Sequence, residues 1–135
     1  MKHEKEFIIF ISISLLFMLD MFSKFLLPNT YLNTGASFNL LDGYNTLLII
    51  IGFITIWILL FLFHELMSIS LTGWFLLFYG TFSNTLDRLI NGGVTDYINM
   101  IFFHNNIADF MLFFGVIFYI YAIITKKEVD SIEHN

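Results

Sequence analysis

The feature of this sequence that most limits its fold is an uncharged, mostly apolar run from Thr46 to Phe63. A helix needs about 20 mostly apolar residues to cross the hydrocarbon core of a bilayer. Three further stretches, about 7–27, 68–86 and 107–125, are nearly as apolar and as long. Unbroken apolar runs lack the alternation of a membrane β-strand. The sequence therefore predicts an all-α membrane protein with four transmembrane helices.

Composition agrees with this assignment. Hydrophobic residues make up 58% of the chain and charged residues 13%, against about 45–50% and about 25% in soluble domains. A length of 135 residues predicts one integral membrane domain over 1–135. The net charge of −5 argues against a nucleic-acid partner. The absence of cysteine excludes a disulfide scaffold, a thiol nucleophile and a thiolate metal site.

Four crossings place both termini on one side of the membrane. The positive-inside rule favours cytoplasmic termini, because the two tails together carry more basic residues than the opposite side. The tails hold Lys2, Lys5, Lys126 and Lys127, and the opposite side holds Lys24 and Arg88. The connections at about 28–45 and 87–106 then face outward. No small-residue cleavage site follows the first apolar run, so we expect it to be retained as a helix.

Polar and ionisable residues gather at the outward ends of these helices. Such groups are costly within a bilayer and usually face the bundle interior or a water-filled cavity. Clustering on one side predicts a functional site. The residues concerned are Asp20, Lys24, Asn33, Asn84, Asp87, Arg88, Asp96, Asn106 and Asp109.

The helical members of this set also have structural interpretations, which the sequence leaves open. Asp20 and Lys24 are spaced i,i+4 and can pair on one helix face. Asp87 can neutralise Lys24 or Arg88 from a neighbouring helix.

Residues in the outward connections have such interpretations too. Asn106 followed by Asp109 resembles a helix N-cap with an acid at the third helical position. Asp96 lies in a GGVTDY segment, where an aspartate often bonds its own backbone.

Gly73 and Gly80 lie seven positions apart in the stretch expected as the third helix, and this spacing favours close approach of a neighbouring helix.

Most known types of intramembrane hydrolysis do not fit the sequence. A zinc protease needs H-E-x-x-H, but HELM at 64–67 is followed by serine. The G-x-G-D motif is absent, and Ser83 has no basic partner that the sequence identifies. Two outward carboxylates, Asp96 and Asp109, remain, and no metal site is predicted.

Paired aspartates can hydrolyse a peptide without a metal. Two carboxyls held close together share one proton. The ionised member can then take a proton from water while the protonated member donates to the scissile carbonyl. A helix N-terminus favours the anionic form, so we predict that Asp109 is the more acidic and that Asp96 carries the shared proton.

Five short motifs occur in an order that resembles one family, signal peptidase II, the bacterial lipoprotein signal peptidase. They are DMFSK at 20–24, NTGASF at 33–38, SNTLDR at 83–88, GGVTDY at 92–97 and NIAD at 106–109. The chain departs from the family pattern in the spacer of the first motif and in Ser83, which replaces a glycine. Asp96 and Asp109 are 13 positions apart, a short separation for the family.

The resemblance implies an aspartic endopeptidase of the bacterial cytoplasmic membrane with an outward-facing site. Its substrate would be a prolipoprotein whose lipobox cysteine bears diacylglycerol. The enzyme would bind this substrate among membrane lipids. It also implies a small extracytoplasmic β-cradle from about Tyr31 to Tyr44, with no cofactor. One chain would hold a complete site, so a monomer would suffice.

The resemblance further implies roles for individual residues. Asp96 and Asp109 correspond to the catalytic pair. Residues that hold the substrate backbone or orient the aspartates would be Asn33, Gly35, Asn84, Arg88 and Asn106. Supporting residues would be Asp20, Lys24 and Asp87.

Two other functions remain open from the residues alone. A non-catalytic four-helix scaffold or assembly factor for lipoproteins would need the helices without the carboxylates. A small proton or ion carrier would use Asp20, Asp96 and Asp109 as a relay. The stretch from Thr46 to Phe63 holds no acid, which disfavours transport.

Overall fold

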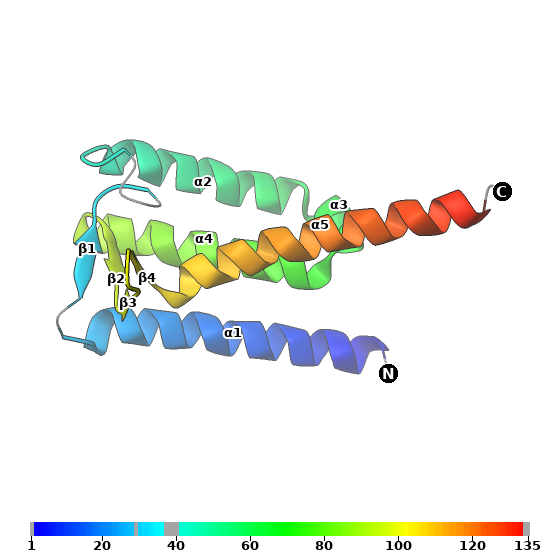
Figure 1. The fold of residues 1–135 in the computed structure, drawn as a ribbon, viewed down its shortest axis with the longest axis horizontal. Coiled ribbons are helices and arrows are strands. Elements are labelled where there is room, and N and C mark those ends of the chain that lie inside the picture. The colour runs from blue at the N-terminus through cyan, green and yellow to red at the C-terminus, as the bar shows by residue number, and fades with distance from the viewer. Residues whose placement is uncertain (1, 29, 37–40, 134–135) are drawn as a thin grey trace.

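The computed structural model describes residues 2–28, 30–36 and 41–133, with side chains from His3 to Lys126 within those ranges. Its helices are α1 (Lys2–Leu26), α2 (Asn45–Phe61), α3 (Phe63–Ile69), α4 (Leu71–Asn91) and α5 (Ile107–Glu133). Its strands are β1 (Tyr31–Asn33), β2 (Val94–Asp96), β3 (Ile98–Asn99) and β4 (His104–Asn105). Figure 1 shows all four strands at one end of a helix bundle, while α1 begins and α5 finishes at the other.

Helix α4 lies at the centre of the bundle and contacts α1, α2, α3 and α5. Glycines allow its close approach to α5. A Cβ on Gly80 would lie 2.9 Å from the carbonyl oxygen of Ala108, and a Cβ on Gly73 would lie 2.9 Å from the Tyr119 ring. The packing interpretation of these two glycines is confirmed. Gly80 therefore sets how closely the first turn of α5 approaches α4.

Two helical segments are long and apolar enough to cross a membrane, His3–Leu26 and Ile107–Lys126. Helices α2 and α3 together form a possible third span, bent by 78°. Within the described residues, α4 does not meet these criteria. Its C-terminal half carries Asn84, Asp87 and Arg88, which the neighbouring elements bury or half-bury. The composition of the helices thus supports a membrane protein without fixing four spans.

Helix ends differ from the expected ranges around the bend and at the C-terminal end of α4. The short connection expected around His64 and Glu65 is helical, as α3. Helix α4 was expected at about 68–86 and runs from Leu71 to Asn91. Ser70 caps its start by accepting a hydrogen bond from the backbone N–H of Gly73 at 3.1 Å.

The C-terminal extension of α4 places Asp87 and Arg88 on the helix, and the connection expected from 87 begins only after Asn91. Gly92 ends the helix in a left-handed conformation, with φ of 76°. Glycine adopts this conformation without steric cost. The glycine pair that follows Asn91 is therefore the sequence signal for this helix end.

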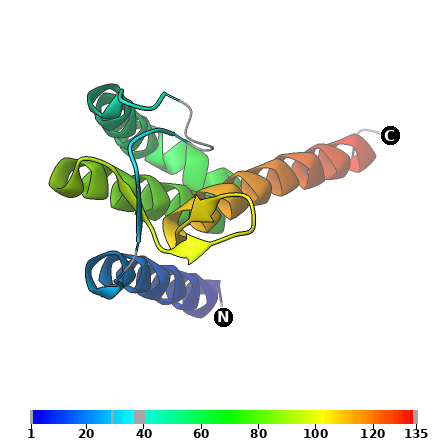
Figure 2. The same cartoon turned by 60° about the vertical axis from the view of Figure 1, so that its left-hand side comes forward.

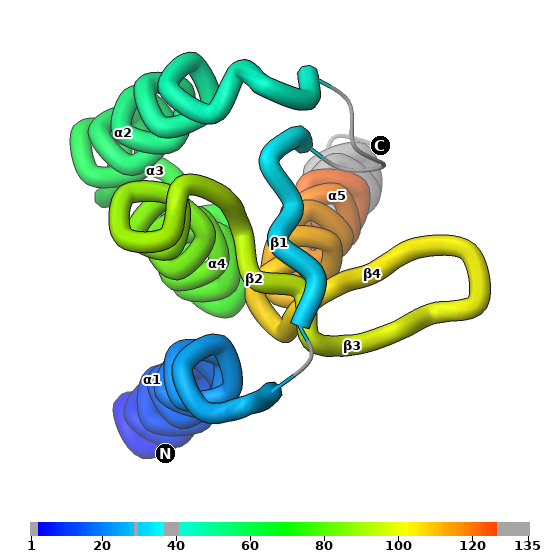
Figure 3. Tube along the Cα trace, turned by 90° about the vertical axis from the view of Figure 1, so that its left-hand side faces the viewer, coloured from blue at the N-terminus to red at the C-terminus, as the bar shows by residue number. Residues whose placement is uncertain are grey.

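The β-cradle differs from the expected 31–44 segment. Strand β1 pairs antiparallel with β2, with Tyr31 opposite Asp96 and Asn33 opposite Val94. The partner of β1 thus comes from the second connection, and residues 37–40 lie outside the described residues. Strands β3 and β4 form a separate hairpin, which the sequence did not predict. Figures 2 and 3 show β1 crossing the end of the bundle and the hairpin projecting from its side.

Candidate active site

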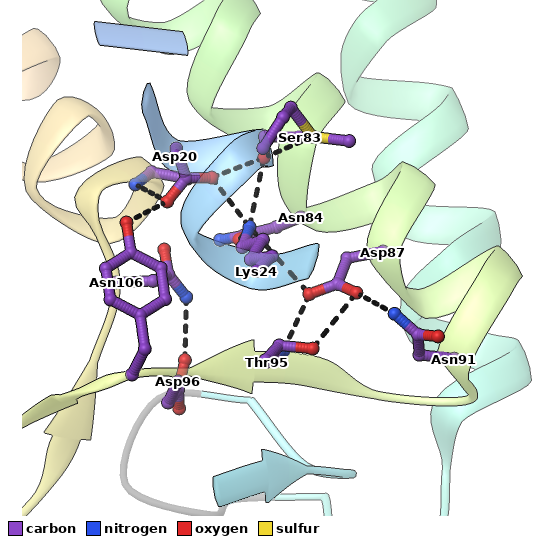
Figure 4. Close-up of polar contacts among 12 residues, drawn as sticks. Asp20, Lys24, Ser83, Asn84, Asp87, Asn91, Thr95, Asp96 and Asn106 are labelled. Atoms are coloured by element: carbon purple, nitrogen blue, oxygen red, sulfur yellow. Dashed lines mark hydrogen bonds and ion pairs between the residues drawn. The ribbon is translucent and has the colours of Figure 1, made fainter. Parts of the chain in front are cut away.

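A buried ion pair joins α1 to α4 at the strand-bearing end of the bundle (Figure 4). The ammonium of Lys24 lies 2.8 Å from Oδ2 of Asp20, and Asp20 is 0% exposed. Ser83 on α4 donates to the same carboxylate oxygen at 2.5 Å and accepts from Lys24 at 3.0 Å. Lys24 also donates to Oδ1 of Asn84 at 2.9 Å. The Asp20–Lys24 pair is therefore part of the contact between the two helices.

Ser83 does have a basic neighbour, contrary to the sequence-based expectation. The two residues lie on different helices, 59 positions apart in sequence, so spacing could not reveal the contact. Lys24 donates to Ser83 and is held by a carboxylate, so it cannot act as a base toward the hydroxyl. Ser83 is fully buried and does not line the cavity described below. These observations do not favour a serine nucleophile.

Three side chains satisfy the first free N–H groups of α5. Tyr97 accepts from the backbone N–H of Ile107 at 3.1 Å, and Asp20 accepts from Ala108 at 3.2 Å. Asn106 accepts from Asp109 at 3.0 Å, as expected of an N-cap. Tyr97 also donates to Asp20 at 2.7 Å. Together these bonds fix the first turn of α5, which carries Asp109.

Asp96, at the end of β2, is buried with both carboxylate oxygens hydrogen-bonded. Asn106 donates to Oδ1 at 2.6 Å and Asn33 donates to Oδ2 at 3.2 Å. Burial, and secondarily the charge of Asp109, raises the pKa of Asp96 to about 6. This carboxyl therefore gains and loses its proton at a pH close to neutral.

Asp109 is held by amide groups from two elements. Asn84 on α4 donates to its Oδ1 at 2.8 Å. The Asn105 amide on β4, oriented to satisfy both of its ends, donates to its Oδ2 at 3.1 Å. Asn106 bonds the side chain of Asp96 and the backbone of Asp109 at once. One amide side chain therefore links the two aspartates.

A cavity of about 670 Å³ lies between α2, α4 and α5 below the β-cradle. Its polar lining includes Asn33, Asn84, Arg88, His104 and Asp109. Its apolar lining includes Leu48, Ile51, Phe110, Leu112, Phe113 and Phe114. Asp96 is 2% exposed and is not among the residues that line the cavity. The cavity therefore offers an apolar wall with polar groups at its strand-bearing end.

Arg88 positions the turn after β1. Its guanidinium donates to Asn45 at 3.1 Å and to the carbonyl oxygen of Gly35. The backbone N–H of Gly35 in turn donates to Asn33 at 3.0 Å, and Asn33 donates to Asp96. A chain of contacts thus runs from α4 through the β1 turn to Asp96.

Asp87 anchors β2 to α4. Its carboxylate accepts from the backbone N–H of Thr95 at 2.6 Å and from Asn91 at 2.7 Å. The ammonium of Lys24 lies 3.9 Å away. Of the two partners that the sequence leaves open, Lys24 lies within ion-pair distance of Asp87, and the charge of Asp87 also acts on Arg88.

Comparison with known proteins identifies the family. The family model described as "Signal peptidase (SPase) II" matches residues 5–125. The chain belongs to the signal peptidase II family. It is accordingly a protease, and the family's activity is lipoprotein processing.

Two relatives and two solved structures illustrate the similarity. A lipoprotein signal peptidase of Staphylococcus haemolyticus is 30% identical, with 84% of this chain and 76% of the relative covered. A lipoprotein signal peptidase of Staphylococcus aureus is 32% identical, with 82% of this chain and 76% of the relative covered. Two bacterial membrane enzymes solved by the in meso method are each 25% identical in sequence. The 2.3 Å structure has a TM-score of 0.75, with 92% of this chain and 90% of that structure covered. The 1.9 Å structure has a TM-score of 0.70, with 89% of this chain and 92% of that structure covered.

Several residues that build this signal peptidase II site escaped the sequence analysis. Tyr97 follows Asp96 directly, and its aromatic ring in a polar segment was the available signal. Thr95 precedes Asp96 in the same motif. Asn45 and Asn105 gave no signal, because their partners Arg88 and Asp109 lie on other elements. Among the described residues, no group of three or more histidine, aspartate or glutamate side chains is arranged to hold a metal ion.

Proposed function

We propose that this signal peptidase II cleaves the signal peptide of diacylglyceryl-modified prolipoproteins by water attack, with Asp96 and Asp109 as the catalytic pair. The observation that carries the proposal is the bridging position of Asn106. Its amide nitrogen bonds the Asp96 carboxylate while its oxygen bonds the backbone of Asp109. Asn106 thus links two acids that are 13 positions apart in sequence, which supports their assignment as a pair.

The proposed reaction requires one proton shared between the two carboxyls. Ionised Asp109 takes a proton from a water molecule as the oxygen of that water attacks the scissile carbonyl carbon. Protonated Asp96 donates its proton to the carbonyl oxygen, which gives a neutral tetrahedral intermediate. Breakdown returns a proton to Asp96 from the new hydroxyl, and Asp109 passes its proton to the departing amine. The raised pKa of Asp96 supports its role as the proton donor.

The cavity suits a substrate that is apolar along one side and polar at the bond to be cut. Leu48, Ile51 and Phe113 offer an apolar wall. Asn84 and Asp109 lie at the polar end of the same cavity. A signal-peptide helix or a diacylglyceryl chain can pack along such a wall while the peptide bond meets the polar groups.

We further propose four crossings in a single domain: α1, the bent α2–α3 pair, α4 and α5. Both chain ends lie opposite the strands (Figure 1), which supports an even number of crossings with the site near the outer face. The polar outward half of α4 is compatible with a crossing because other helices surround it. One chain supplies every residue of the proposed site, so a monomer is sufficient.

The test is cleavage of a diacylglyceryl-modified prolipoprotein in detergent by the parent, Asp96→Asn and Asp109→Asn. We expect each substitution to lower kcat by about 10²- to 10⁴-fold with unchanged helix content by circular dichroism. Ser83→Ala serves as a comparison, because a serine mechanism would lose all cleavage in this variant. Equal cleavage by the parent and both aspartate variants would refute the proposal.

Absence of cleavage by all three proteins would favour the scaffold instead. A proton or ion carrier would show acid-dependent flux across vesicles with no cleavage.

A further inference from the structure

The tip of the β3–β4 hairpin carries the most exposed large apolar side chains of the described protein. Ile101 is 91% exposed and Phe102 is 92% exposed. Met100 beside them is also exposed. Neighbouring apolar side chains that are almost fully exposed form a patch of the kind that marks an interaction site. The lipid-facing sides of the helices do not account for this tip, because it belongs to no helix.

The hairpin is an ordered element. Ile98 pairs with Asn105 and Asn99 pairs with His104. The backbone N–H of Met100 donates to the carbonyl oxygen of Phe103 at 2.8 Å, which closes the turn. The two apolar side chains are therefore presented at the end of a braced turn.

The position of the hairpin points to lipid as its partner. Figure 3 shows it projecting sideways from the bundle, past α5. Figure 1 shows it level with the outward turns of α1 and α4, and not beyond them. Residues 97–108 contain no aspartate, glutamate, lysine or arginine. The apolar span of α5 begins at Ile107, directly after the hairpin.

We propose that the Ile101–Phe102 tip inserts into the outer-leaflet interface of the bilayer. Apolar side chains at the edge of a membrane protein gain from leaving water, and the interface accommodates a polar backbone. The tip would extend, beside α5, the apolar surface that this helix presents to lipid. Its insertion would brace β4, which carries His104 and Asn105 at the cavity. The inference rests on the proposed membrane placement of the chain and not on the aspartate mechanism.

The absence of cysteine permits a direct test. Single variants Ile101→Cys and Phe102→Cys of the full chain are labelled with an environment-sensitive fluorophore in vesicles of phosphatidylethanolamine and phosphatidylglycerol. Leu15→Cys, on the exposed side of α1, is the lipid reference. Asp42→Cys, exposed in the first outward connection, is the aqueous reference.

We expect emission from both tip labels at shorter wavelength than from the Asp42 label. We also expect loss of quenching by aqueous iodide, and quenching by lipids spin-labelled near the headgroup more than by lipids labelled at the chain end. Iodide quenching equal to that at Asp42 would overturn the inference, as would protection from both quenchers, which would indicate protein contact. Failure of lipid quenching at Leu15 would instead overturn the membrane placement on which the inference rests. None of these readouts depends on cleavage.

Discussion

Asn106 performs two tasks that a single substitution can separate. Its oxygen caps α5 and its nitrogen donates to Asp96. Asn106→Ser keeps a good N-cap residue and removes the donor to the carboxylate. That bond favours the ionised form, so its loss raises the pKa of Asp96 further above about 6.

In the proposed mechanism, Asp96 must be protonated, so kcat/KM falls as pH rises through the pKa of Asp96. We predict that Asn106→Ser moves this falling limb to higher pH by about 1–2 units, since a hydrogen bond to a charged group contributes about 1.5–3 kcal/mol and one pKa unit corresponds to about 1.4 kcal/mol. The pH profile of cleavage measures the shift. Asn99→Ser, at an exposed position on β3, is the control. A limb at the same pH in parent and Asn106→Ser would contradict the assignment of Asp96 as proton donor.

We predict that Lys24 stabilises the contact between α1 and α4. Its ammonium is buried against Asp20, Ser83 and Asn84. Lys24→Met leaves the Asp20 carboxylate buried without its cation, which costs about 3–5 kcal/mol of the free energy of unfolding. Thermal unfolding in detergent should show the loss, whereas Lys5→Met, at an exposed position, should change little. Equal midpoints for the two variants would show that the ion pair does not hold α1 to α4.

Among the helices, the contact of α4 with α5 determines where Asp109 lies. A Cβ on Gly80 would meet the carbonyl oxygen of Ala108 at 2.9 Å. Gly80→Ala must therefore push the first turn of α5 outward, at a cost of about 1–3 kcal/mol. We expect a lower unfolding midpoint together with reduced cleavage. Ile90→Ala, on an exposed side of the same helix, should change neither, and a Gly80→Ala variant with parental activity would count against this role.

The helices could be located from the sequence because apolar runs are local signals. Their ends at Phe61 and Asn91 were less certain, since a bend or a glycine cap shifts a boundary by a few residues. The pairing of β1 with β2 could not be predicted, because these strands lie about 60 positions apart and each has only three residues. Contacts such as Ser83 with Lys24 were missed for the same reason. Motif order placed the candidate residues, but only the fold shows which of them are in contact.

Over the whole molecule, polar groups are concentrated at the strand-bearing end of the bundle, and both chain ends run to the opposite end (Figure 1). We predict that single cysteines at Lys5 and Lys126 react with a membrane-impermeant maleimide only after the cells are permeabilised. A cysteine at Asp42 should react in intact cells. Labelling of Lys5→Cys and Lys126→Cys from opposite sides would require an odd number of crossings and contradict the proposed topology.

The proposed mechanism requires that the carboxyls of Asp96 and Asp109 interact closely enough to share a proton. The test is a titration of Asp96, monitored by ¹³C NMR of labelled aspartate carboxyls. The Asp96 signal is the one that is absent from the spectrum of Asp96→Asn. In the parent we expect a pKa of about 6, and in Asp109→Asn a lower value, because the charge of Asp109 contributes to the elevation. Burial should keep that lower value above the ordinary one of an aspartate. An identical Asp96 titration in parent and Asp109→Asn would show that the two carboxyls do not act as a pair.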